Sequence, residues 1–100
     1  MTKEKTRVYI CGKITGDPNF GEKFQAAREL LEASGYEVTS PVSYTNPVWS
    51  RETCMRVVIR ELCLCDAIYL LPDWKNSKGA RLEAIIAKEL KMEFVKLKIE

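Results

Sequence analysis

The stretch RVYICGKITGDP, residues 7–18, decides the fold class of this chain. Its first five residues are mostly β-branched or aromatic, which favours a strand, and two glycines and a proline then interrupt the run. A strand that ends in a glycine loop ahead of a helical segment is the start of a βαβ unit. We therefore expect the remainder of the chain to alternate strands with helices.

Residues beyond this loop alternate between the periodicities of a helix and of a strand. Helices are predicted at 19–34, 50–64 and 80–91. Strands are predicted at 7–11, 36–40, 67–71 and 93–99. The order predicts an α/β fold, a flavodoxin- or Rossmann-like parallel sheet of four to five strands with helices on both faces. Residues 1–100 fit one domain of ordinary size.

The composition excludes several classes of function. The 16 Lys and Arg residues and 14 Asp and Glu residues are interspersed, which argues against general nucleic-acid binding. No apolar run approaches the ~20 residues of a membrane span, so we expect no membrane partner and a cytoplasmic location. The chain has no histidine, which excludes catalysis by histidine and metal ligation by histidine.

The four cysteines are Cys11, Cys54, Cys63 and Cys65. They form no C-x-x-C pair, so we expect them to be reduced, buried and small apolar in character. We expect no metal site and no cofactor.

Ligands of parallel α/β folds bind beyond the carboxyl ends of the strands. The loops predicted at that edge span residues 12–18, 41–49 and 72–79. The first holds the candidate ligand-binding residues Gly12, Lys13, Ile14, Thr15 and Gly16. Backbone amides, a lysine and a hydroxyl there suit an anionic group such as a phosphate. The alternative is a tight turn that needs glycine dihedral angles.

Glu83 is the most informative polar residue. On a helical wheel it lies between Ile86 and Leu90 on one side and Ala87 on the other, so its carboxylate is predicted to point toward the sheet. We also expect it in the first turn after Gly79, where the helix macrodipole stabilises negative charge. The alternative is a carboxylate that reaches solvent.

Other polar and aromatic residues near the predicted loops have two interpretations each. Asp66 serves a ligand or a turn, and Ser77 serves a ligand or caps a helix. Trp49 and Trp74 lie in two loops of the same edge, where each stacks on a base, packs a subunit contact or fills the core.

Four motifs occur together in a recognisable order. They are YICGKITG at 9–16, GYEV at 35–38, CDAIYLLPDW at 65–74 and SKGARLE at 77–83. The ordered set resembles a small bacterial and phage domain of the nucleoside 2-deoxyribosyltransferase-like superfamily, and the resemblance covers residues 8–95.

The resemblance implies an N-glycosidase or 2-deoxyribosyltransferase that acts on a nucleoside or nucleotide. Glu83 matches the nucleophile that attacks the anomeric carbon, and Tyr9 matches the residue that orients it. The substrate-binding positions implied or suggested are Gly12, Lys13, Ile14, Thr15, Gly16, Asp66, Asp73, Trp74, Ser77 and Gly79. The implied mechanism is double displacement through a glycosyl-enzyme ester.

One position departs from the pattern. Active relatives carry an aspartate eight residues before the strand aspartate, where this chain has Val58. Asp73 and Glu61 are possible substitutes for the missing acid. The alternative function is therefore a non-catalytic nucleotide-binding or interaction module. We also expect a homodimer or higher oligomer, with an apolar face of the 50–64 helix and Trp49 in the contact.

Overall fold

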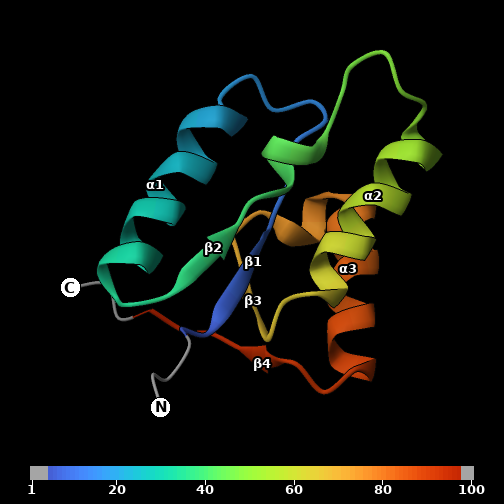
Figure 1. The fold of residues 1–100 in the computed structure, drawn as a ribbon. Coiled ribbons are helices and arrows are strands. Elements are labelled where there is room, and N and C mark those ends of the chain that lie inside the picture. The colour runs from blue at the N-terminus through green and yellow to red at the C-terminus, as the bar shows by residue number, and fades with distance from the viewer. Residues whose placement is uncertain (1–4, 98–100) are drawn as a thin grey trace.

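The computed structural model describes residues 5–97, and these form one parallel sheet with helices on both sides (Figure 1). The strands are β1 (Arg7–Cys11), β2 (Glu37–Thr39), β3 (Ala67–Leu70) and β4 (Glu93–Phe94). The α-helices are α1 (Phe20–Ala33), α2 (Arg51–Cys63) and α3 (Lys78–Glu89). Short 3₁₀ turns occupy Pro41–Tyr44 and Trp74–Asn76.

The sheet has the order β2-β1-β3-β4, and every neighbouring pair is parallel. Val8 is in register with Val38 on one side and with Ala67 on the other. The chain leaves β1 toward one edge and later crosses to the opposite side of β1, which makes the boundary between β1 and β3 the topological switch point. The predicted α/β class, parallel sheet and four strands are confirmed.

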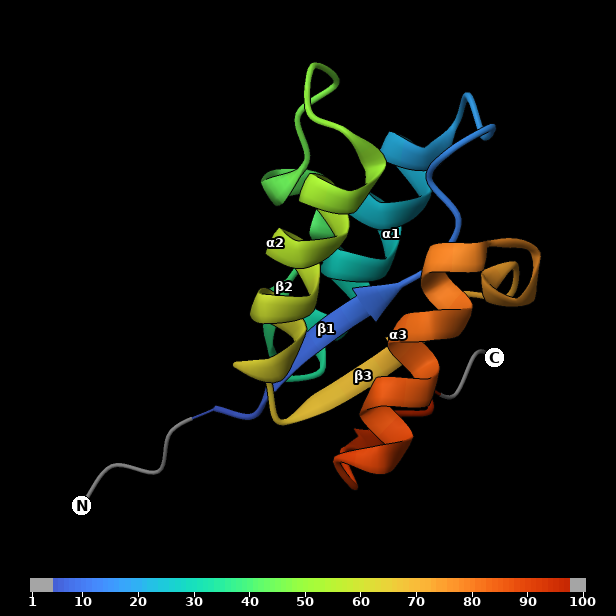
Figure 2. The same ribbon diagram turned by 90° about the vertical axis from the view of Figure 1, so that its right-hand side faces the viewer.

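Alternation along β1 divides the core into two layers. Val8 and Ile10 pack with the buried residues of α1, and Tyr9 and Cys11 pack with those of α2 and α3. Figure 2 shows α2 and α3 on the near side of the sheet with α1 behind it. Tyr9 is thus buried on the same side of the sheet as α3.

The helices begin and end largely where the sequence predicts. Gly35 follows α1 with φ +94°, as a glycine at a helix C-terminus does. The third helix begins at Lys78 rather than residue 80, because the Ser77 side chain accepts a hydrogen bond from the Ala80 amide.

The last predicted strand is too long. Pairing ends at Phe94, although Val95 still donates its amide to the Ile68 carbonyl. Val95 is buried and Leu97 packs on the same cluster, so the alternation in this segment reflects burial rather than continued pairing. Residues 98 and 99 of the predicted strand lie outside the described residues.

The expected burial of all four cysteines is wrong. Cys63 is exposed and Cys54 half-buried, so only Cys11 and Cys65 match the expected burial; all four thiols are free. On α2, Val58 and Leu62 are buried, whereas Met55 and Ile59 of the same apolar stripe are half-buried. Val58 and Leu62 are thus not available for a subunit contact, and the predicted oligomer contact stays a prediction.

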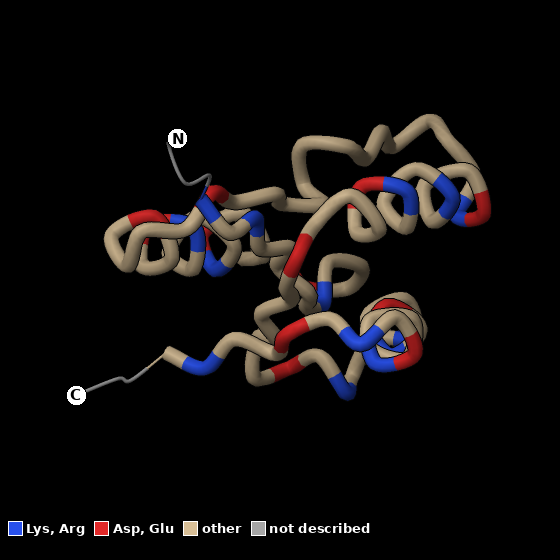
Figure 3. The backbone as a smooth tube through the Cα atoms, turned by 60° about the horizontal axis from the view of Figure 1, so that its bottom comes forward, with Lys and Arg blue, Asp and Glu red and all other residues tan. Residues whose placement is uncertain are grey.

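The surface is mixed in charge. Acidic and basic residues occur together on all three helices (Figure 3). Within residues 5–97, no helix is long and apolar enough to cross a membrane.

Candidate functional site

A cavity of about 530 Å³ lies at the carboxyl edge of the sheet. Its walls come from the loop after β1, the segment after β2, and the first turns of α2 and α3. The lining residues are Gly12, Ile14, Thr15, Phe20, Pro41, Thr45, Asn46, Pro47, Trp49, Arg51, Cys54, Met55, Val58, Ser77, Gly79, Ala80 and Glu83. This volume suits a small organic ligand, since ligand pockets commonly measure roughly 300–1,000 Å³.

Glu83 contributes a buried carboxylate to this cavity. Its side chain comes from α3, points toward the sheet as predicted, and is 5% exposed. Tyr9 Oη donates a hydrogen bond of 2.6 Å to Glu83 Oε2. Cys11 Sγ lies 3.5 Å from Glu83 Oε1 and 3.3 Å from the Ala80 carbonyl. The alternative of a solvent-reaching carboxylate is excluded.

The protonation states in this cluster follow from burial. Burial raises the pKa of Glu83 to about 7, and the hydrogen bonds from Tyr9 and Cys11 oppose part of that rise. Burial and the neighbouring carboxylate raise the pKa of Tyr9 far above its ordinary value. Tyr9 therefore keeps its proton and acts as a donor, while Glu83 titrates near neutrality.

The macrodipole explanation for Glu83 is wrong. Because α3 begins at Lys78, Glu83 is in the second turn, beyond the first turn where the effect is strongest. Gly79 occupies the first turn, where an added Cβ would lie 3.1 Å from Met55 Sδ. The small residue at this point lets α3 approach α2.

The glycine loop after β1 has structural requirements of its own. A Cβ on Gly12 would lie 2.5 Å from Leu71 Cδ1, and Gly16 has φ +84°. Both glycines are thus needed for packing or turning. Gly12, Ile14 and Thr15 line the cavity, whereas Lys13 and Gly16 are not among its lining residues.

Lys13 takes part in a different structure, an ion cluster that joins the loops after β1 and β3. Lys23 Nζ pairs with Asp17 at 2.5 Å and also with Asp73, and it donates to the Lys13 carbonyl at 2.8 Å. Lys13 donates its own amide to Asp73 Oδ1 at 3.2 Å. We call Asp17, Lys23 and Asp73 the loop clasp.

The clasp changes the expected role of Asp73. Partial burial opposes ionisation of Asp73, but the hydrogen bonds from Lys23 and the Lys13 amide outweigh it and lower the pKa of the carboxyl. Asp73 is therefore held ionised, which disqualifies it as a substitute general acid. Glu61 is also unsuitable, because it lies in the last turn of α2 beside Arg60 and does not line the cavity.

Three other predicted substrate-binding residues lie in different parts of the structure. Ser77 caps α3 and also lines the cavity. Trp74 packs against the core layer of α2 and α3, with Lys75 Nζ 5.7 Å from its ring centroid. Asp66 accepts a hydrogen bond of 3.0 Å from the Arg7 amide at the amino edge of the sheet, so the structure does not bring it to the cavity.

Val58 is both buried and part of the cavity wall. It is 3% exposed, packs in the same layer as Tyr9, and lines the cavity wall. Among the cavity-lining residues that the structure describes, Glu83 is the only carboxylic acid.

Two lining residues were missed or given too little weight. Arg51 provides a cation at the first residue of α2, and Trp49, which is 41% exposed, provides an aromatic ring two residues earlier. Ser50 caps this helix start, since its side chain accepts a hydrogen bond from the Thr53 amide. The position of the helix start at the carboxyl edge is the signal that points to Arg51.

Residues 6–96 match the family model described as "Domain of unknown function (DUF4406)". The chain belongs to that family. The match spans β1 to β4, so the family's domain includes the cavity together with Tyr9 and Glu83. No curated protein matches the chain.

Proposed function

We propose that this protein cleaves the N-glycosidic bond of a nucleoside or nucleotide, with Glu83 as nucleophile. The observation that carries the proposal is the buried pair of Glu83 and Tyr9 in the wall of the cavity. A carboxylate held by a neutral hydroxyl, in a site without histidine, has the chemistry of a retaining glycosyl-transfer nucleophile.

The reaction has two steps. In the first, ionised Glu83 attacks the anomeric carbon, the bond from this carbon to the base nitrogen breaks, and the base leaves with the electron pair. In the second, water or an acceptor base attacks the same carbon, the ester bond to Glu83 breaks, and the proton of the attacking group passes to the departed base anion. Tyr9 keeps Glu83 Oε2 engaged, which leaves Oε1, 3.5 Å from the Cys11 thiol, as the oxygen with the weaker partner.

The lining of the cavity supports this substrate class. Trp49 offers an aromatic face for a base, and Arg51 offers a cation for a 5′-phosphate near the amino ends of α2 and α3. The ordered motifs that resemble the nucleoside 2-deoxyribosyltransferase-like superfamily support the same substrate class.

A second candidate is a nucleotide-binding module without catalysis. Val58 favours it, because a hydrocarbon occupies the wall where active relatives hold an acid, and general acid help is typically worth ~10²–10⁴-fold. The clasp removes Asp73 from consideration as a replacement.

The test is incubation with a panel of nucleosides and nucleoside 5′-monophosphates, with free base measured by chromatography. Wild-type protein should release base, and Glu83→Gln should release none while still binding ligand in calorimetry. Glu29→Gln, which changes an exposed carboxylate on α1, is the matched control and should behave as wild type. Binding without release by wild type would establish the second candidate, and base release by Glu83→Gln would exclude the mechanism.

A further inference from the structure

The helix α3 has two dissimilar sides. Its buried side carries Glu83 together with three alanines. Its opposite side carries Lys78, Leu82, Ile85 and Glu89, which we call the outer strip of α3. Leu82 is 41% exposed and Ile85 is 60% exposed, although both are large hydrophobic residues. Leu82 and Ile85 lie three positions apart on one helix face, so they form one small exposed apolar patch at the centre of the strip.

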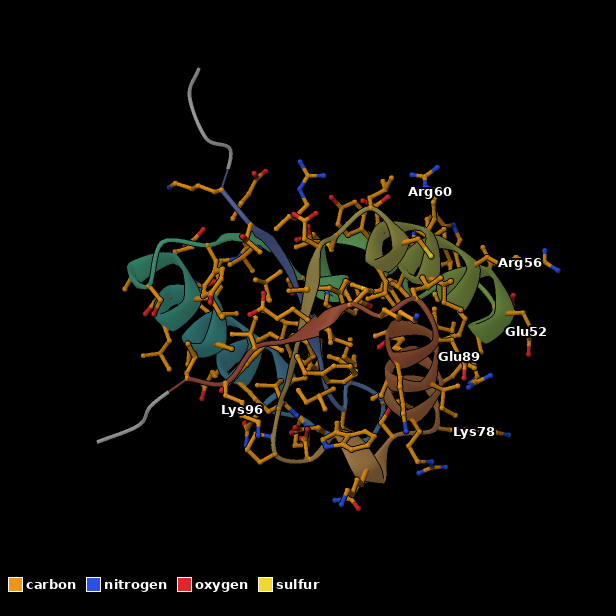
Figure 4. All side chains as sticks on the ribbon, turned by 90° about the horizontal axis from the view of Figure 1, so that it is seen from below. Glu52, Arg56, Arg60, Lys78, Glu89 and Lys96 are labelled. Carbon is orange, nitrogen blue, oxygen red and sulfur yellow. The ribbon has the colours of Figure 1, made fainter. Side chains whose placement is uncertain are left out.

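The outer strip is symmetric in sequence and opposite in charge at its ends. At 100° per residue its four residues fall within about 60° of the helix surface. Lys78 precedes Leu82 by the same four positions that separate Ile85 from Glu89. Lys78 and Glu89 project from opposite ends of α3 on the side away from the sheet (Figure 4).

We propose that the outer strip binds a second copy of this chain, with the two α3 helices antiparallel about a two-fold axis. Such an axis places Leu82 against the partner's Ile85, and Lys78 against the partner's Glu89, each twice. This self-complementarity in both apolar character and charge is the reason to identify the occupant as another copy of the chain.

The outer side of α2 lacks this combination. Its exposed residues include Glu52, Arg56 and Arg60, so along the helix one acidic residue is followed by two basic ones (Figure 4). An antiparallel pairing of two such sides would set Arg56 near the partner's Arg56, because this residue lies midway between the other two. Like charges at the axis oppose association.

The size of the strip sets the strength of the contact. A 12-residue helix is about 18 Å long, so two such helices bury less than the roughly 1,600 Å² of a standard interface. We expect a reversible dimer with a dissociation constant on the order of micromolar. The cavity stays open in this dimer, because Glu83 is on the other side of α3.

Sedimentation equilibrium of the full chain from about 1 to 200 µM tests the proposal. Wild type should pass from monomer to dimer in this range. Ile85→Glu should weaken the dimer more than about tenfold, since it places a charge in the apolar centre twice. Leu64→Glu is the matched control, because Leu64 is also 60% exposed but lies at the end of α2, and it should leave the dimer unchanged.

Charge reversal distinguishes this antiparallel pairing from any other contact made through α3. Lys78→Glu and Glu89→Lys should each weaken the dimer several-fold, and the double variant should restore it, since both cross-pairs are rebuilt with opposite polarity. A monomer at 200 µM, a dimer unaffected by Ile85→Glu, or a double variant no tighter than the single variants would each overturn the proposal. None of these outcomes bears on base release, which is assayed separately.

Discussion

Replacing Glu83 by glutamine should change the pH dependence of stability in a defined direction. The side chain ionises near pH 4.5 in an unfolded chain, and burial raises its pKa to about 7 in the folded protein. Folding therefore favours the protonated form, and stability is lost as pH rises from 4.5 through 7. The difference of two to three pKa units corresponds to roughly 3 kcal/mol.

Glutamine keeps the shape and an oxygen for Tyr9 but cannot ionise. Its amide nitrogen near Cys11 Sγ costs about 1–2 kcal/mol at any pH, because that donor gains only a weak acceptor. We therefore expect Glu83→Gln to match or fall slightly below wild type at pH 5 and to exceed it at pH 8. The change in this difference between pH 5 and pH 8 does not contain the constant cost. It should equal most of the ionisation term, because a part of that term is already lost at pH 5.

Urea denaturation at the two pH values, followed by circular dichroism, measures this difference. In thermal melts it corresponds to a relative shift on the order of 10 °C for a domain of this size. Glu29→Gln should follow wild type, because Glu29 is exposed. If wild type and Glu83→Gln lose or gain stability in parallel between pH 5 and pH 8, the buried carboxylate does not have the raised pKa on which this reasoning depends.

Four further substitutions test the site. Base release should increase with pH around a midpoint near 7, and Tyr9→Phe should move that midpoint upward and slow release about tenfold or more, because the ionised carboxylate loses its best donor; a pH–rate profile measures both. Arg51→Ala should weaken nucleoside 5′-monophosphate binding about tenfold in calorimetry with little effect on nucleosides, whereas Lys13→Ala should change neither. Val58→Asp should melt below wild type, since the position is 3% exposed, and raise base release by up to ~10²–10⁴-fold; a lower melting temperature without faster release would favour the binding module.

The fold was predictable because its signals are local and repeated. The strand, glycine and helix of residues 7–33 set a pattern that the rest of the chain repeats, and Gly35 marks the first helix end without tertiary information. The predicted strand at 93–99 failed for a physical reason. Alternating burial of Val95 and Leu97 resembles strand periodicity, although pairing with β3 ends earlier.

The site was predictable where it depends on one helix face and unpredictable where it depends on how loops meet. The wheel position of Glu83 gave its direction correctly, but its partnership with Tyr9 also requires that α3 cross β1 on the correct side of the sheet. Which cation lines the cavity depends on loop paths that periodicity does not give: the sequence indicates Lys13, and the structure places Arg51 there. The position of Asp66 before β3 places it at the amino edge, a consequence of strand direction alone.

The loop clasp has a consequence for how a ligand enters. One ammonium group holds the loops that follow two adjacent strands, so the sheet side of the cavity mouth moves as a unit with β1 and β3. On the opposite side, the turn at residues 46–49 is closed mainly by bonds of Asn46 to its own neighbours, and Val48 is 84% exposed. We therefore expect any widening of the mouth to occur at the turn that carries Trp49. Under the proposed function, the residue that offers a face to the base would also control its entry.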